Sequence, residues 1–351
     1  MNEKRGKGMA VTIKDVAALA GVSPSTVSRT CKDNPSISKE TKEKVRKAML
    51  TLGYEPNFQA SNLASHNSKT IGIILPSSEK ENFENPFFLE SIRGISQFCN
   101  DRQYVSTVVT GKNNEDLIGV IRTMVRSGQV DGFILLYSKA DDAIIEYLNE
   151  EGILYVLVGK AQQFANLTIY IDNDNVLAGK EATDYLYDLG HRKIAYLGSE
   201  SIKLFSADRK TGYQLSMISH DLEINKKYII EVEDVYLDEC ELLLSMLKSE
   251  DRPTAIVVSD DILAVSLERV CFQCGISIPK DLSIISFNDS LFAKLTYPPL
   301  TSINVNSSQL GIEAASQLIN HIENPNLVAT KIIVPHSLVE RESCRRIEEE
   351  S

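Results

Sequence analysis

The spacing of apolar residues near the start of the chain predicts three short helices. Between Ile13 and Ala20, apolar residues recur at intervals of three and four, which places them on one face of a helix. Gly21 ends this helix, and Pro24 begins the next at a position that tolerates proline. A third helix is predicted from Thr41 to Leu52. The first two, joined by a tight turn, have the arrangement of a helix-turn-helix.

From Lys69 onward the pattern changes to short apolar runs that alternate with longer amphipathic stretches. Runs such as Thr70–Leu75 and Ala255–Val258 are typical of buried parallel strands. The stretches between the runs have helical spacing, and the alternation occurs twice in series. The body is therefore predicted to be two α/β lobes, each a doubly wound parallel sheet, with a cleft between them.

The predicted organisation is a small all-α headpiece followed by a two-lobed sensor body. Its segments are a disordered lead (1–10), the helix-turn-helix headpiece (11–56), a hinge helix and linker (57–68), the body (69–343) and a charged tail (344–351). Lobe 1 is predicted to comprise about 69–170 and 301–329, and lobe 2 about 171–300 and 330–343. The strand Ser302–Val305 is thus assigned to lobe 1, and the segment Lys331–Arg341 to lobe 2.

Charge is divided unevenly along the chain. The net charge of the 351 residues is −11, which by itself argues against a nucleic-acid partner. Residues 1–69, however, hold 12 Lys/Arg and 6 Asp/Glu, a net +6, while the remainder holds 25 and 42, a net −17. A basic segment is the electrostatic footprint of a DNA-binding domain. The acidic body is expected to repel DNA, so that only the headpiece approaches the phosphates.

The outer face of the second predicted helix carries side chains suited to reading DNA. Arg29 can form a bidentate pair with guanine, and Ser25, Thr26 and Ser28 can reach phosphates or base edges. Lys32 adds salt-dependent attraction to phosphates. A turn of this kind also occurs in ordinary helical domains, so the turn alone leaves DNA binding and simple packing open.

The whole N-terminal block resembles the DNA-binding headpiece of the LacI/GalR family of transcriptional regulators. The matching motifs are Thr12-Ile-Lys-Asp-Val-Ala, Gly21-Val-Ser, Thr26-Val-Ser-Arg29, Ser38-x-x-Thr41, Gly53-Tyr-x-Pro-Asn57 and Leu63-Ala. The resemblance continues through Gly190-His-Arg-Lys-Ile194, Arg209-Lys-Thr-Gly-Tyr213, Arg252-Pro-Thr-Ala255, Pro298-Pro-Leu-Thr-Ser-Ile303 and Val339-Glu-Arg-Glu-Ser343. It therefore extends from Val11 to about Ser343.

The resemblance implies a periplasmic-binding-protein-like body and a homodimer that binds a pseudo-palindromic operator. It implies DNA contacts from Thr12, Ser23, Pro24, Ser25, Thr26, Ser28, Arg29, Lys32, Tyr54, Asn57, Ala60, Leu63 and Ala64. Pro24 stands where some relatives place a larger reading side chain, which weakens base readout there. A hinge helix from Asn57 to Ser65 would lie in the minor groove with Leu63 as an apolar wedge. Ordinary packing is the alternative role for Leu63.

A set of aromatic and planar polar residues follows the predicted strands, where ligands bind in open α/β sheets. The candidate effector-binding residues are Phe87, Phe88, Tyr137, Asp172, Phe205, Arg209, Asp260 and Asn288. Aromatic faces and bidentate polar groups suit the C–H faces and hydroxyls of a sugar. By resemblance, Arg209 clamps the effector, and Asn288-Asp289 replaces a more acidic pair that contains Asp. For Phe87 and Phe88 the alternative role is packing in the core. For Asp260 the alternative role is capping of the helix that follows it.

Two segments resemble the maltose-type repressors of Gram-positive bacteria, namely Asn85-Pro-Phe-Phe88 and Ser206-Ala-Asp-Arg-Lys-Thr-Gly-Tyr213. The predicted function is a transcriptional repressor controlled by a sugar effector, maltose or a maltooligosaccharide. Binding of the sugar is expected to release the repressor from its operator. The alternatives are a global catabolite regulator controlled by a protein partner and a repressor controlled by a purine or another ligand.

Other function classes lack their sequence signatures. No P-loop, G-x-G-x-x-G, G-x-S-x-G or H-E-x-x-H motif is present, so we predict no enzyme activity and no cofactor. Six scattered cysteines, with only Cys271 and Cys274 in a C-x-x-C pair, indicate buried thiols in a reducing cytoplasm and no metal site. No apolar run is long enough for a membrane span, and no secretion signal is expected.

Overall fold

The computed structural model describes residues 11–31, 33–54, 67–76, 85–200, 203–233, 235–237 and 240–347. The chain divides into two units, Met1–Asn67 (the headpiece) and Ser68–Ser351 (the body). The predicted lead, 1–10, and the predicted hinge helix from Asn57 to Ser65 lie outside the described residues.

Three helices form the described headpiece, as the apolar spacing predicts. They are α1 (Ile13–Ala20), α2 (Pro24–Cys31) and α3 (Lys39–Leu52). Gly21 and Gly53 end α1 and α3 with φ of 67° and 62°, a left-handed conformation that glycine adopts without steric cost. Val16, Val27 and Val45, one from each helix, are fully buried and hold the three helices together.

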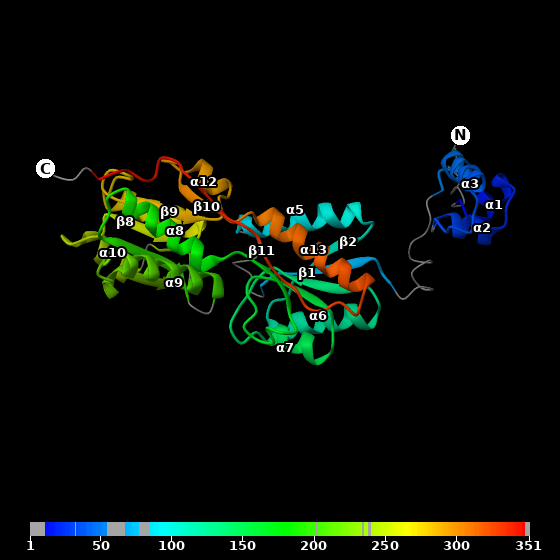
Figure 1. Ribbon diagram of the computed structural model, residues 1–351, viewed down its shortest axis with the longest axis horizontal. Helices are drawn as coiled ribbons and strands as arrows, with labels where there is room; N and C mark the ends of the chain where they lie inside the picture. The colour runs from blue at the N-terminus through cyan, green and yellow to red at the C-terminus, as the bar shows by residue number, and fades with distance from the viewer. Residues whose placement is uncertain are drawn as a thin grey trace, which may run out of the picture. The chain divides into compact units, whose positions relative to one another are not determined.

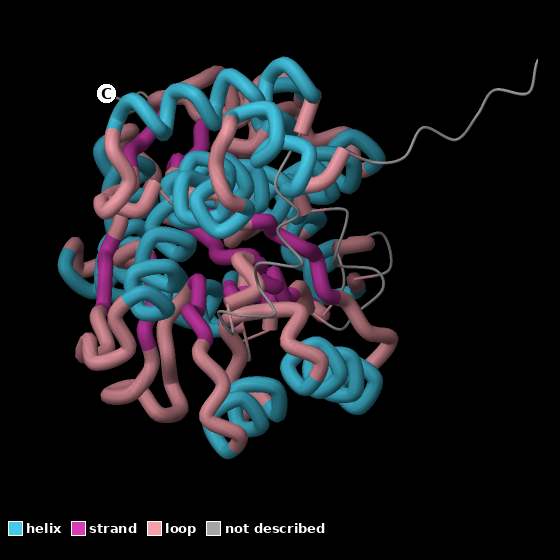
Figure 2. Tube along the Cα trace, turned by 90° about the vertical axis from the view of Figure 1, so that its right-hand side faces the viewer, coloured by secondary structure: helices cyan, strands magenta, loops and turns pink. Residues whose placement is uncertain are grey.

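Lobe 1 of the body is a parallel six-stranded sheet between two layers of helices (Figures 1 and 2). Its strands are β1 (Thr70–Ile74), β2 (Val105–Val109), β3 (Gly132–Leu135), β4 (Tyr155–Val158), β5 (Ile169–Asp172) and β11 (Lys331–Ile333), in the order β11-β5-β4-β3-β1-β2. Its helices are α5 (Pro86–Asp101), α6 (Asn114–Arg126), α7 (Ala143–Glu150) and α13 (Ser307–Glu323). Helices α5 and α13 bury one face of the sheet, and α6 and α7 bury the other.

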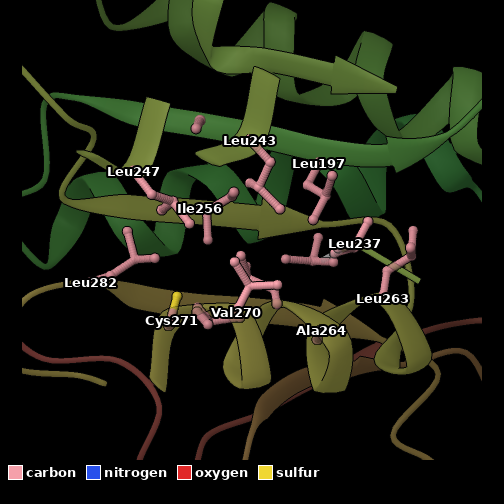
Figure 3. Packing of buried hydrophobic residues seen from close by; sticks show 14 of the residues in the cluster. Leu197, Leu237, Leu243, Leu247, Ile256, Leu263, Ala264, Val270, Cys271 and Leu282 are labelled. Atoms are coloured by element: carbon pink, nitrogen blue, oxygen red, sulfur yellow. The ribbon is translucent and has the colours of Figure 1, made fainter. Parts of the chain in front are cut away.

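Lobe 2 repeats this architecture with one antiparallel edge strand. Its strands are β6 (Ile194–Ser199), β7 (Ile229–Val232), β8 (Ala255–Val258), β9 (Ser283–Phe287), β10 (Thr301–Asn304) and β12 (Ser337–Val339), in the order β12-β10-β9-β8-β6-β7. Its helices are α8 (Asn175–Asp188), α9 (Leu204–Ser219), α10 (Glu241–Lys248), α11 (Asp261–Gln273) and α12 (Leu291–Leu295), and a 3-10 turn spans Lys226–Tyr228. Figure 3 shows the core between this sheet and helices α10 and α11, where Leu197, Leu243 and Leu263 meet.

The structure corrects two lobe assignments made from the sequence. Strand β10 was expected in lobe 1, but it pairs with β9 in lobe 2. The segment from Lys331 was expected in lobe 2, but β11 pairs with β5 in lobe 1, and only β12 rejoins lobe 2. An apolar run shows that a strand is buried and does not show which strand lies beside it. The chain therefore crosses between the lobes after β5, after β10 and between β11 and β12.

Two further differences from the predicted elements lie in lobe 2. The short helix α12 was not predicted, because five residues are too few to show a helical period. The charged tail was predicted to begin at residue 344, but the packed part of lobe 2 extends further. Cys344 contacts the carbonyl of Ile284, and the Ile347 N–H donates to the carbonyl of Leu189. Residues 344–347 are thus part of the packed lobe.

Glycine lets α8 and α9 pack in backbone contact, which sets the position of Arg209 on α9. A Cβ added at Gly179 would lie 2.2 Å from the carbonyl oxygen of Arg209, and one at Gly212 would lie 2.1 Å from the carbonyl oxygen of Val176. Both distances are far inside van der Waals contact, so only glycine fits at these two positions.

We expect Gly179→Ala to destabilise the body by about 1–3 kcal/mol, the usual effect of overpacking, and to displace Arg209. Urea unfolding measures the change. Gly119→Ala in α6 is the matched control, because nothing lies within 4 Å of its added Cβ. This second substitution is expected to be neutral or slightly stabilising. Equal losses of stability in the two variants would contradict the packing argument.

Candidate functional site

The exposed face of α2 presents the side chains that the sequence selects for DNA contact. Val27 is fully buried against the other headpiece helices, which orients the helix. Ser25 and Arg29 are consequently exposed, and Thr26 and Ser28 are half-exposed. Exposed hydroxyls and a guanidinium on one face of a short helix are the groups that contact phosphates and base edges.

Ser23 organises the start of α2. Its hydroxyl accepts the Thr26 backbone N–H at 3.1 Å and lies 2.8 Å from Ser25 Oγ and 2.9 Å from Thr26 Oγ1. Pro24 follows as the first helical residue and is exposed. Ser23 therefore caps α2, and three hydroxyls gather at one helix N-terminus, where backbone N–H groups favour anions.

The remaining predicted DNA contacts are distributed between exposed, half-buried and undescribed positions. Thr12 is exposed and donates both its N–H (2.8 Å) and its hydroxyl (2.7 Å) to Asp15. Tyr54 is half-buried against the headpiece core, and burial raises its pKa. Lys32, Asn57, Ala60, Leu63 and Ala64 lie outside the described residues. DNA contact by all of these residues stays a prediction.

Some of the basic side chains of the headpiece are paired with carboxylates and are therefore less available to DNA phosphates. Asp33, at a φ of 49°, accepts from Lys42 at 2.9 Å and from Arg46 at 3.0 Å, and Lys44 pairs with Glu40 at 2.8 Å. The pairs around Asp33 also join the end of α2 to α3. The net charge of the segment therefore overstates the number of cations available to phosphates.

One cavity in the body gathers all eight candidate effector residues. It has a volume of about 350 Å³, at the lower end of the range for small-molecule sites, and both lobes contribute to its walls. Lobe 1 contributes Phe87, Phe88, Tyr137 and Asp172, and lobe 2 contributes Phe205, Arg209, Asp260 and Asn288. The cavity lies at the carboxyl ends of the strands, as expected for open α/β sheets.

Arg209 is a buried cation held rigidly in the cavity wall. Its Nε donates to Asn175 Oδ1 at 2.9 Å, and its Nη1 donates to the Ser259 carbonyl at 2.6 Å. The guanidinium carbon lies 4.3 Å from the centre of the Phe287 ring and 5.0 Å from that of Phe205. Burial lowers its pKa to about 10, so the group is charged at neutral pH. A rigid guanidinium is suited to bidentate recognition of ligand oxygens.

Two buried carboxyls line the same cavity as Arg209 and interact electrostatically with it. Asp172, at the end of β5, accepts the Asn173 N–H at 2.8 Å and the Asn175 amide at 3.0 Å, and burial raises its pKa to about 7. Asp260 accepts the Ile262 and Leu263 N–H groups at 3.0 Å, and burial raises its pKa as well. Asp260 thus caps α11, as the sequence alternative held, and also lines the cavity.

The raised pKa of Asp172 makes stability depend on pH. The ordinary value is 3.8, so between about pH 4 and pH 7 the folded protein keeps a proton that the unfolded chain has released. The free energy of unfolding therefore falls as pH rises through this window. Glu268, whose pKa burial raises to about 7, adds a contribution of the same sign.

We expect Asp172→Asn to reduce the loss of stability between pH 5 and pH 7.5, because the amide keeps an oxygen acceptor and does not titrate. Urea unfolding at the two pH values measures the difference. Asp174→Asn removes an exposed carboxylate from the same segment and is the control. An unchanged pH dependence in Asp172→Asn would show that Asp172 does not titrate in this range.

The aromatic candidates combine packing with cavity lining. Phe87 and Phe88 meet edge to face, with ring centres 5.7 Å apart, and Phe88 also belongs to the lobe 1 core. Burial raises the pKa of Tyr137 far above its ordinary value, which keeps its hydroxyl neutral. Asn288 has a φ of 100°, which is unusual for a residue other than glycine and concentrates at functional sites. Effector contact by these residues stays a prediction.

Several cavity residues were missed from the sequence. Lys139 lies two residues after Tyr137 and Lys160 two residues after the end of β4, so the same rule applied a little further would have found them. Glu233, Val235 and Tyr236 follow strand β7, whose carboxyl end was not among the selected positions. Lys160 pairs with Asp208 of lobe 2 at 3.1 Å, and Lys139 forms a β-bridge with Lys203. These contacts tie the two lobes at the cavity.

Within the part of the chain that the structure describes, no cluster of His, Cys, Asp or Glu side chains is arranged to hold a metal ion. No described helix is long and apolar enough to cross a membrane.

A helix-turn-helix headpiece joined to a two-lobed body with an inter-lobe cavity defines a ligand-controlled DNA-binding regulator. Comparison with known proteins agrees. Residues 12–57 match the family "Bacterial regulatory proteins, lacI family", and residues 183–344 match "Periplasmic binding protein-like domain". The chain belongs to the LacI family. It is a DNA-binding transcriptional repressor and not an enzyme.

Relatives of known name cover nearly the whole chain. The HTH-type transcriptional regulator MalR of Streptococcus pneumoniae is 35% identical over 338 residues, which is 95% of this chain and 100% of that protein. MalR of Staphylococcus xylosus is 34% identical over 343 residues, or 97% and 99% of the two chains. A structure of a transcriptional regulator CelR–cellobiose complex is 26% identical, with a TM-score of 0.74, and covers 95% of this chain and 99% of that one.

Proposed function

We propose that this repressor binds a pseudo-palindromic operator as a homodimer and that maltose or a maltooligosaccharide in the cavity releases it. The observation that carries the proposal is the inter-lobe cavity, whose lining combines Arg209, Asp172 and Asp260 with the aromatic side chains of Phe87 and Phe205. Charged planar groups satisfy sugar hydroxyls, and aromatic rings cover the C–H faces of the sugar rings.

The relatives support a sugar of this kind. Two of them, at 35% and 34% identity, carry the name MalR, and a third was solved as a complex with cellobiose, a disaccharide. Because the cavity draws its walls from both lobes, a bound sugar changes the angle between the lobes. A change of angle in each subunit of a homodimer repositions the two headpieces, which lowers operator affinity.

Each headpiece reads one half-site. Arg29, Ser25 and Thr26 on the exposed face of α2 enter the major groove, and Leu63 acts as a wedge in the minor groove. Pro24 is exposed on the same helix and has no donor, so base readout is weak at that position. The acidic body keeps the rest of the molecule away from the phosphates.

A thermal-shift screen followed by a gel-shift titration tests the proposal. The screen uses maltose, maltotriose, cellobiose, ribose and hypoxanthine, and we expect stabilisation by the first two, since a bound ligand stabilises the fold by mass action. The gel shift uses DNA selected in vitro with the purified protein. Maltose is expected to lower its affinity by about 5- to 150-fold, the usual range of such coupling.

Two outcomes would contradict the proposal. Stabilisation by hypoxanthine or ribose, with none by maltose or maltotriose, would overturn the effector assignment. Stabilisation by maltose with an unchanged or increased DNA affinity would overturn release as the direction of control.

A further inference from the structure

The three chain segments that cross between the lobes meet at one side chain. Each crossing begins just after a strand: Asn173 follows β5, Val305 follows β10 and Val334 follows β11. All three are buried, with exposed fractions of 5%, 1% and 4%. The Nδ2 amide of Asn173 donates to the Val305 carbonyl at 3.1 Å and to the Val334 carbonyl at 2.8 Å.

The amide of Asn173 is well suited to fix the spacing of these segments. An amide nitrogen carries two hydrogens in one plane, and here each is directed at a carbonyl from a different crossing. Movement of any one crossing relative to the others lengthens at least one of the two bonds. Both carbonyls are in a buried setting, where an unpaired polar group is costly.

Asn173 is also connected to the cavity. Its backbone N–H donates to Asp172 Oδ1, and the same oxygen accepts the Asn175 amide. Asn175 Oδ1 in turn accepts the Arg209 Nε at 2.9 Å. A continuous series of hydrogen bonds therefore runs from the effector-facing cation and carboxyl to the point where the lobes are joined.

We propose that Asn173 is the positioning residue that sets the angle between the lobes and couples cavity occupancy to it. The amide holds the three crossings in one arrangement, and a ligand that moves Asp172 or Arg209 acts on that arrangement directly. The coupling part of this inference rests on the proposed function, whereas control of the inter-lobe angle does not.

The angle is measured in full-length protein without any ligand. Spin labels carried by noncanonical amino acids at Glu150 in α7 and Lys248 in α10, both exposed, report the inter-lobe distance without touching the native cysteines. We expect a narrow distance distribution for the wild type and a broad one for Asn173→Ala. Asn173→Ser, which keeps one donor, is expected to lie between them.

Asn149→Ala is the matched control. The amide of Asn149 also donates two hydrogen bonds, to the Ile145 carbonyl at 2.9 Å and to the Tyr155 hydroxyl at 2.7 Å, but both partners belong to lobe 1. This variant is expected to lose stability and to keep the narrow distribution. A wild-type distribution in Asn173→Ala, or equal broadening in Asn149→Ala, would overturn the proposal. If the alanine variant does not fold, the distance distribution of Asn173→Ser, compared with those of the wild type and Asn149→Ala, tests the proposal in the same way.

A second measurement addresses coupling, with maltose as the probe. The readout is the ratio of operator affinities without and with saturating maltose. We expect this ratio to fall by roughly fivefold in Asn173→Ala, toward the value for an uncoupled protein, and to be kept in Asn149→Ala. An unchanged ratio would contradict the coupling role. A wild type that does not respond to maltose would refute the proposed effector, and the distance distributions would still decide the role of Asn173.

Discussion

Replacement of Arg209 by alanine is expected to abolish the response to effector while operator binding persists. The guanidinium is the buried cation of the cavity, and truncating one partner of a buried charged contact costs about 2–5 kcal/mol. That range corresponds to a loss of effector affinity of roughly 30-fold or more, at about 1.4 kcal/mol per factor of ten. Isothermal titration with maltose measures the affinity, and a gel shift measures operator binding.

The reason for so large an effect is that Arg209 serves both the ligand and the cavity wall. Its removal leaves Asn175 Oδ1 and the Ser259 carbonyl without the donor that Arg209 supplies, and it takes away one of the cations that act on the carboxyls of Asp172 and Asp260. Some loss of thermal stability is therefore expected as well. Arg209→Lys keeps the charge but lacks the planar fork, so we expect it to restore stability better than it restores affinity.

Arg192→Ala is the control for Arg209→Ala. Arg192 is an exposed arginine of lobe 2 that donates to the Tyr187 carbonyl and does not line the cavity. The Arg192→Ala variant is expected to bind the effector with the affinity of the wild type. Normal effector affinity in Arg209→Ala would show that the cavity is not the effector site.

Replacement of Arg29 by alanine is expected to produce the largest loss of operator affinity among single changes in the described headpiece. A good bidentate contact to guanine contributes about 1–3 kcal/mol, and a homodimer has two copies, so the expected loss is about 2–6 kcal/mol. Because Arg29 is exposed, the fold should not change. Binding to unrelated DNA, which depends on phosphate charge, should fall much less.

Arg46→Ala removes the same charge from a different place and is the matched control. Arg46 pairs with Asp33 at 3.0 Å, so its contribution to phosphates is already reduced. Gel shifts on the selected operator and on an unrelated duplex, at two salt concentrations, compare the two variants. Equal losses on both DNAs would show that Arg29 contacts only the phosphate backbone.

Much of the fold follows from the sequence because its signals are local. Capping at Ser23, the glycine ends at Gly21 and Gly53, and the position of Pro24 depend on backbone geometry within one or two turns. The central strands of the two sheets are short and buried on both faces, so their apolar runs are visible without knowledge of their neighbours. The predicted strands Thr70–Leu75, Ala255–Val258 and Ser302–Val305 accordingly lie within one residue of the observed β1, β8 and β10 at each end.

The lining of the candidate cavity was partly predictable, because ligands in open α/β sheets bind at the carboxyl ends of the strands. All eight residues chosen from the carboxyl ends of strands, including Asp172 and Arg209, line the same cavity. The rule was not applied at β7, which Glu233 directly follows, and it does not select Tyr236, which lies four residues after the end of that strand. It also does not show that Asp260 both caps α11 and lines the cavity.

By itself the sequence determined the class of most elements, the helix-turn-helix face around Arg29 and the set of side chains suited to a sugar. The tertiary structure decided which sheet each late strand joins, since β10 and β11 exchanged lobes relative to the expectation. It also revealed that the crossings converge on Asn173. The physical reason is range. Caps and periodicity act over a few residues, whereas the pairing of β11 with β5 and the contact from Asn173 to Val334 join segments more than a hundred residues apart, and no local pattern records them.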